Sequence, residues 1–167
     1  MTNKKIELTE LHNLFDIRHG SKLDLNKMTQ CELGENSIAF IGRSNEDNGI
    51  VAFVEELNDL EPFESGLITV ALGGSALSSF VQPLKFYTAQ NIDVLKPKFE
   101  MTLDEKLYYC LCIEANRFRY STFGREANRT LKNLLVPKMK FVPSWVNGAT
   151  KNAIQELNRD LYKVIGA

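Results

Sequence analysis

The sequence predicts an α+β fold, in which a twisted and mostly antiparallel sheet of short strands packs with helices and ends in a helical C-terminal segment. Short β-type runs bounded by turn residues fill the first part of the chain, and helix-type patterns fill the second. Strands that precede helices, rather than alternating with them, are typical of α+β folds. A content of 44% hydrophobic and 25% charged residues is ordinary for one globular domain of this size.

The first strands are marked by their turns. "LFDIR" (14–18) runs into the turn-forming "HGSK", and "NSIAFIG" (36–42) and "GIVAFVE" (49–55) flank "RSNEDN". Asn48 and Gly49 form a strong hairpin signal, because both residue types tolerate a positive φ. These runs predict three strands, of which the last two form an antiparallel hairpin.

Four further runs complete the predicted sheet. "GLITVAL" (66–72) and "LSSFVQ" (77–82) flank "GGSA", a pattern that indicates a second hairpin. "LKFYTA" (84–89) and "NIDVL" (91–95) add β-type residues before Pro97.

Three helices are predicted after the strands. The first begins at Thr102, which stands three residues before Glu105 as in a capping box, and its apolar residues surround the axis, so we expect it to be well buried. The second covers 125–135. One ~100° arc of it carries polar and basic residues, and the other side carries Ala127 and leucines. The arc consists of Arg125, Asn128, Arg129 and Lys132.

The third helix spans about 150–165 and has apolar residues at a, d, a, d spacing. This covers only about two heptads, so the helix either docks on its own domain or meets a partner helix. We expect one domain over residues 1–145 and a separate C-terminal helical segment over 146–167. The apolar positions are Ile154, Leu157, Leu161 and Val164.

The charges are unevenly divided along the chain. Residues 1–84 hold six basic and thirteen acidic residues, whereas residues 85–167 hold fourteen and eight. The basic excess gathers between residues 117 and 140, where Glu126 is the only acid. A one-sided basic patch is typical of a protein that binds a polyanion, although it can equally be a solvated face. The cations are Arg117, Arg119, Arg125, Arg129, Lys132, Lys138 and Lys140.

The sequence assigns no cofactor, metal or membrane segment. The N-terminus lacks the apolar core of a signal peptide and no apolar run is long enough to cross a bilayer, so we expect a cytoplasmic location. Cys31, Cys110 and Cys112 lack the spacing of a zinc site and fit buried free thiols better. His12 and His19 have no companions at ligand or triad spacing and receive no role.

Most enzyme motifs are also missing from the sequence. It contains no phosphate-binding GxxxxGK[ST], no GxSxG elbow and no HExxH. Asp93, Lys96, Lys98 and Glu100 have neither the order nor the spacing of a nuclease site. We therefore expect no catalytic residues, with a small metal-dependent nuclease as the least favoured alternative.

Two predicted turns carry side chains that suit DNA. Asparagine and arginine can each make paired hydrogen bonds to base edges, and serine binds phosphate. The same residue types also supply ordinary turn geometry, so no single one requires a function. The turns contribute Arg43, Ser44, Asn45 and Asn48 from the first hairpin, and Ser75 and Ser78 from the second.

Taken in order, these segments resemble a known family. "LFDIRHGSKL", "IAFIGRSNEDNGIVAFV", "GLITVALGGSALSSFVQPLKFY", "IDVLKP" and "YSTFGREANRTLKNLLVP" resemble the target recognition domain of type I restriction-modification DNA specificity subunits, including the BcgI-like type IIB relatives. The resemblance covers most of residues 8–145 and rests on five weak motifs in the right order.

The resemblance implies a non-catalytic reader of double-stranded DNA. Such a domain reads one half of a bipartite site and positions a methyltransferase subunit, and in full systems a nuclease, without a cofactor of its own. The resemblance defines the scaffold more than the contacts, so the candidate contacts rest on side-chain chemistry and on placement in the two turns and the basic segment. They are Arg43, Ser44, Asn45, Asn48, Ser75, Ser78, Arg117, Arg119, Arg125, Asn128, Arg129 and Lys132.

The chain departs from that family in one respect. Specificity subunits usually carry two recognition domains separated by long helices, whereas this sequence has one domain and one short helix. It is therefore a half-subunit that forms a homodimer, a stand-alone reader or part of a larger chain. The main rival interpretation is a protein-interaction module that uses its leucine-rich helices and does not bind DNA.

Overall fold

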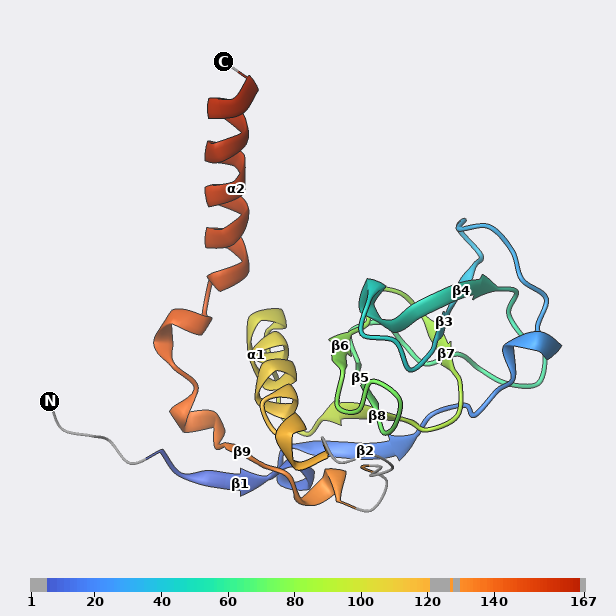
Figure 1. Cartoon of the computed structure of the whole chain (residues 1–167), viewed down its shortest axis with the longest axis horizontal. Coiled ribbons are helices and arrows are strands. Elements are labelled where there is room, and N and C mark those ends of the chain that lie inside the picture. The colour runs from blue at the N-terminus through green and yellow to red at the C-terminus, as the bar shows by residue number, and fades with distance from the viewer. Residues whose placement is uncertain (1–5, 121–126, 128–129, 166–167) are drawn as a thin grey trace, which may run out of the picture.

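The computed structural model describes residues 6–120, 127 and 130–165, and it confirms the α+β fold (Figure 1). The strands are β1 (Leu8–Glu10), β2 (Phe15–His19), β3 (Ile38–Ile41), β4 (Ile50–Val54), β5 (Ile68–Ala71), β6 (Ser79–Val81), β7 (Phe86–Thr88), β8 (Ile92–Pro97) and β9 (Leu135–Pro137). The α-helices are α1 (Leu103–Glu114) and α2 (Ala149–Ile165). Short 3-10 helices occupy Leu11–Asn13, Leu25–Lys27, Asp47–Gly49, Arg117–Tyr120, Leu131–Asn133, Met139–Phe141 and Ser144–Val146.

The strands divide among three sheets rather than forming one. A four-stranded antiparallel sheet has the order β2-β8-β5-β6, and a three-stranded sheet has the order β4-β3-β7. The pair β3–β7 is parallel, and the other strand pairs in the described residues are antiparallel. β1 pairs with β9, so a segment near the N-terminus joins one that is about 125 residues further along the chain.

Both predicted hairpins are confirmed. β3 pairs with β4, and β5 pairs with β6. Gly49 has a φ of +76° in the first turn, a conformation that glycine adopts without the penalty a side chain would bring. The Gly42 amide donates to the Gly49 carbonyl at 2.8 Å, so the turn closes on itself.

The core lies on both faces of the four-stranded sheet. Phe15 and Leu95 on one face pack with Tyr109 and Ile113 of α1. On the other face, Ile92 and Val94 pack with residues of β3 and β7. The result is three layers, with α1, the four-stranded sheet and the three-stranded sheet in succession (Figure 1). The connecting loops begin and end on the strands of this core. Because those strands are buried, they hold both ends of each loop in place.

The first predicted helix begins as expected. The Thr102 hydroxyl accepts from the Glu105 amide at 3.2 Å, and the Glu105 carboxylate accepts from the Thr102 amide at 2.8 Å. The capping box predicted from the sequence is therefore confirmed.

The expectation that this helix is well buried was wrong. Tyr109, Cys110 and Ile113 are buried, but a second row of leucines on α1 is exposed, at 38–63% of each side chain's reference surface. The sheet covers one side of α1 only, and apolar residues all around the axis leave the other side without a partner. The exposed residues are Leu103, Leu107 and Leu111.

The predicted helix over 125–135 is wrong in the part that the structure describes. Leu131–Asn133 forms a single 3-10 turn, and Leu135–Pro137 is strand β9. Val136 precedes a proline, which disfavours helical backbone, and it is fully buried against the core. Long-range pairing with β1 therefore overrides the local helical pattern. Arg125, Glu126, Asn128 and Arg129 lie outside the described residues.

The C-terminal helix is confirmed as α2. Its first turn is bound to α1, where Asp104 accepts from the Thr150 amide at 3.2 Å, and the rest of the helix extends away from the molecule (Figure 1). Residues 151–159 are all exposed, so in this part α2 does not dock on its own domain. Within the described residues, no helix is long and apolar enough to span a membrane.

Candidate nucleic-acid interface

The sheet topology brings four connecting loops to one end of the β framework. His19 at the end of β2 and Val70 near the end of β5 both lie opposite Asp93, which is near the start of β8. The Leu72 amide then donates to the Asn91 carbonyl at 2.9 Å. We call this surface, formed by residues 20–23, 42–49, 72–78 and 89–91, the loop end.

Bonds between loops tie the two sheets together at the loop end. The Ser75 amide donates to the Arg43 carbonyl at 3.4 Å, and the Ala89 amide donates to the Ile41 carbonyl at 2.8 Å. The Ser21 amide donates to the Thr88 hydroxyl at 2.8 Å. Loops that are up to 70 residues apart in sequence thus form one surface with a fixed arrangement.

The first predicted turn presents its polar side chains outward. Arg43, Asn45 and Asn48 are exposed, and Asn48 has a φ of +56°. The half-buried Ser44 accepts from the Glu46 amide at 3.1 Å, a local bond that stiffens the turn. The turn therefore offers an arginine and two asparagines at defined positions.

The second turn packs directly against the first. A Cβ added to Gly74 would lie 3.3 Å from the Cβ of Arg43, and Ser75 is half-buried beside it. Ser78 is only 2% exposed, so its hydroxyl is not available to DNA in this structure. Its oxygen instead accepts from Arg117 Nη2 at 2.9 Å, and Arg117 Nε donates to the Ala76 carbonyl at 3.0 Å. Arg117 and Ser78 thus hold this loop.

The predicted basic cluster is not one surface. Arg119 is exposed and lies 5.6 Å from the Phe118 ring centre. Lys132 is exposed, but its carbonyl bonds to His12, which lies in the 3-10 helix before β2, at the far end from the loop end. The structure therefore does not bring Lys132 to the two turns. Arg125, Asn128 and Arg129 lie outside the described residues.

Two other lysines of the cluster bind an acid. Lys138 and Lys140 contact the Glu7 carboxylate at 2.8 and 3.1 Å. Hydrogen bonds from both lysines hold the pKa of Glu7 below its ordinary value. These two cations are thus already paired with an acid that is about 130 residues away in sequence.

Sequence reasoning missed other polar residues at the loop end. Lys22 and Gln90 are exposed there, and Asn91 is half-buried with a φ of +58°. The signal that could have found them is their place directly after two predicted strands. Among the described residues, no group of three or more histidine, cysteine or acidic side chains could hold a metal ion.

A rigid β framework that gathers polar loops at one end defines a recognition domain. The chain belongs to the type I restriction modification DNA specificity domain family, whose model matches residues 3–141. The resemblance found in the sequence is therefore confirmed.

Individual relatives agree with that assignment. The chain is 28% identical over 139 residues to the specificity subunit of the type II restriction enzyme BcgI from Heyndrickxia coagulans, covering 81% of this chain and 39% of the relative. Its fold is similar to the crystal structure of the S subunit of a type I restriction-modification system from M. genitalium, with a TM-score of 0.60 and 19% identity over 99% of this chain and 43% of that one. The HsdS subunit from Thermoanaerobacter tengcongensis gives a TM-score of 0.63 with 13% identity, over 98% and 41%. The chain thus spans about two fifths of the length of these relatives.

Proposed function

We propose that this chain is the non-catalytic DNA-recognition part of a restriction-modification system, which reads one half of a duplex site. The observation that carries the proposal is the loop end, where exposed Arg43, Asn45 and Asn48 stand on a turn held by backbone bonds. Arginine pairs with guanine and asparagine with adenine in the major groove, so these three side chains suit base recognition. Membership of the DNA specificity family supports the same function.

The remaining predicted contacts take different roles in this proposal. Ser44 and Ser75 contact the sugar-phosphate backbone beside the bases, and exposed Arg119 contacts a phosphate. Arg117 and Ser78 hold loop 72–78 in place through their hydrogen bonds. Lys132 contacts at most a phosphate remote from the two turns. Arg125, Asn128 and Arg129 complete the phosphate contacts in the proposal, on the strength of the sequence alone.

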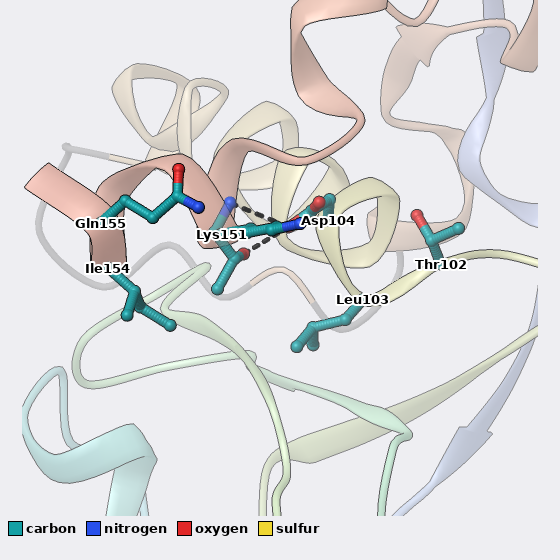
Figure 2. A pocket seen from close by; sticks show the side chains of 7 residues that line it. Thr102, Leu103, Asp104, Lys151, Ile154 and Gln155 are labelled. Carbon is teal, nitrogen blue, oxygen red and sulfur yellow. Dashed lines mark hydrogen bonds between the residues drawn. The ribbon is translucent and has the colours of Figure 1, made fainter.

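The apolar surfaces of the two helices support a protein partner in addition to DNA. Ile154 and Leu157 of α2 are 52% and 65% exposed, and the exposed Leu103 of α1 lines the same groove as Ile154. Figure 2 shows Leu103 and Ile154 pointing to the same side of a groove of about 490 Å³ where the two helices meet. This observation favours the interaction-module function as a second activity of the same chain.

The partner that we propose for α2 is a second copy of this chain, which would supply the other half of the site. The a and d residues of α2 cover only about two heptads, and the exposed Leu103 of α1 enlarges the surface beside Ile154. A methyltransferase subunit, and a nuclease where a system has one, then binds the assembled pair.

Selection from a random duplex library at several salt concentrations tests the DNA function. We expect one short asymmetric motif, and a slope of log K against log salt of about −4 to −5, as for ~5 phosphate contacts. The variant Arg43→Ala should relax the motif at one position. Lys85→Ala is the matched control, because Lys85 pairs with Glu64 before β7, away from the loop end. A protein that binds no duplex at low salt would refute the proposal.

Light scattering across a concentration series tests the dimer. Ile154→Asp should dissociate it, whereas Asn152→Asp adds the same charge at another exposed position of α2 and should not. A wild-type protein that stays monomeric at every concentration would contradict the homodimer while leaving DNA recognition intact.

A further inference from the structure

His19 and Asp93 form an asymmetric pair where β2 ends and β8 begins. His19 Nδ1 lies 2.7 Å from Asp93 Oδ1. The histidine side chain is 63% exposed, but that of the aspartate is only 6% exposed. A nearly buried carboxylate therefore binds one side of an imidazole ring whose other side meets solvent.

The burial of Asp93 is not explained by stability alone. Burial raises the pKa of its carboxyl, which shows that the surroundings disfavour the charge, while His19 and Lys22 act in the opposite direction. Its neighbour in β5 is the apolar Val70, so among the described residues the charged groups that act on it come from β2 and the loop after it. Replacing a buried ion pair by apolar residues is often neutral or stabilising. The carboxylate thus suggests a role in orienting His19.

That orientation determines what the exposed nitrogen can do. A bond between Nδ1–H and the carboxylate leaves Nε2 as the outward atom of the ring. In the imidazolium form Nε2 carries a proton and donates, whereas in the neutral ring it only accepts.

His19 lies at the loop end, close to the turns proposed to contact DNA. It shares one row of the sheet with Asp93 and Val70, and adjacent strands are about 4.8 Å apart, so the row from β2 to β5 measures about 10 Å. Loop 72–78 starts two residues beyond Val70. One DNA duplex, whose major groove is about 12 Å wide, can therefore meet both positions.

The chain just after His19 is held rigidly. The Gly20 amide donates to the Ile92 carbonyl at 2.9 Å, and a Cβ on Gly20 would lie 2.0 Å from the Thr88 hydroxyl oxygen. Ser21 and Thr88 exchange hydrogen bonds of 2.8 and 3.3 Å between amide and hydroxyl. The ring therefore projects from a fixed point of the framework.

We propose that His19 is a further DNA contact, whose protonated Nε2 donates a hydrogen bond to an acceptor on the duplex, and that Asp93 is the positioning residue that orients it. This inference rests on the proposed DNA function. The acceptor is a phosphate oxygen or the acceptor edge of a base. Either way, the donor is lost when the ring loses its proton, so we expect binding to weaken as the pH rises.

The test measures duplex affinity by fluorescence anisotropy between about pH 5.5 and 8 at constant ionic strength, with the selected motif as the probe. Wild type should lose about tenfold in affinity over this range, as expected for one lost charged hydrogen bond. His19→Gln should bind about tenfold more weakly at low pH and lose the pH dependence. Asp93→Asn should weaken binding at low pH, because it removes the carboxylate that orients the ring, and adding His19→Gln to it should then cost less affinity than in wild type.

The control is His12→Gln, since His12 lies before β2, away from the loop end. It should keep both the wild-type affinity and the pH profile.

Because Asp93 is buried, its variant is first checked by thermal melting. If Asp93→Asn unfolds, the variant of the exposed His19 is used alone for the test. A salt slope reduced by about 1 in His19→Gln identifies a phosphate, and relaxed selection at one base pair identifies a base.

Two failures are distinguishable. If wild type binds its motif and His19→Gln keeps the same affinity and pH profile, the histidine contact is refuted and the DNA function stands. If wild type binds no duplex at any pH, both are refuted.

Discussion

Variants of Arg117 test directly whether this residue stabilises the second turn through hydrogen bonds or contacts DNA. Its guanidinium donates from Nε to the Ala76 carbonyl and from Nη2 to Ser78, at 3.0 and 2.9 Å. Arg117→Met removes both donors and keeps much of the aliphatic stem. Arg117→Lys keeps the charge, but its single ammonium group does not reproduce the two-pronged geometry.

The expected loss of stability follows from the burial of Ser78. A buried polar group left without its partner costs about 1–3 kcal/mol. Ser78 is 2% exposed, whereas Ala76 is half-buried and the Arg117 side chain is 47% exposed, so water replaces part of the interaction. The ion pair of Arg117 with Glu114, at 3.8 Å and near the surface, adds little. We therefore expect a loss of about 1–2 kcal/mol in Arg117→Met, from the lower part of that range.

Thermal melting and a salt titration together decide the role of Arg117. At this chain length, a loss of about 1–2 kcal/mol corresponds to a fall in Tm of about 2–8 °C. Both variants should melt earlier and bind DNA more weakly, with an unchanged salt slope. A phosphate contact would instead leave Arg117→Lys near wild type and reduce the slope of Arg117→Met by about 1. A change in Tm below about 1 °C in Arg117→Met would refute the supporting role.

Three further predictions concern a turn, an ion pair and a thiol. Gly49→Ala should lower the free energy of unfolding in urea by about 1–2 kcal/mol, because φ is +76° at this position. Since Lys138 and Lys140 lower the pKa of Glu7 from 4.5, their pairing stabilises the fold above that pH and is lost as the pH falls through the lowered value. Glu7→Gln should therefore flatten the acid side of the plot of stability against pH. Burial raises the pKa of Cys110 to about 12, so a thiol reagent at about pH 8 should modify it only after unfolding.

Each of these predictions has an internal comparison. Gly34 has no atom within 4 Å of an added Cβ, so Gly34→Ala should change stability less than Gly49→Ala, and equal losses would contradict the turn argument. An acid limb that is identical in Glu7→Gln and wild type would show that the pairing contributes nothing. The half-buried Cys31 should react in the native protein before Cys110, and the reverse order would contradict the burial of Cys110.

Much of the fold was predictable because its determinants are local. Asn48-Gly49 and the glycine-rich second turn encode hairpins over a few residues, and Thr102 with Glu105 encodes the start of α1. Local backbone preferences act within such short spans, and the structure confirms all three features. The order of these motifs also indicated the family.

Where long-range contacts compete with local preference, the sequence prediction failed. Residues 131–137 carry a helical pattern, but Val136 is buried and its strand pairs with β1. The apolar ring around α1 predicted complete burial, yet only one sheet covers the helix, and Leu111 remains 63% exposed. Neither outcome depends on residues nearby in sequence.

By itself, then, the sequence determined the strands of the two larger sheets, their turns and the supply of polar side chains in the loops, since these depend on neighbouring residues. Only the tertiary structure decided which loops meet, which cations stay unpaired and which polar side chains are buried. Glu7 binds Lys138 from about 130 residues away, and Asp93 binds His19 across 74 residues. Such pairs form because the core brings the strands together, and that packing is what separates Arg43 at the surface from Ser78 inside.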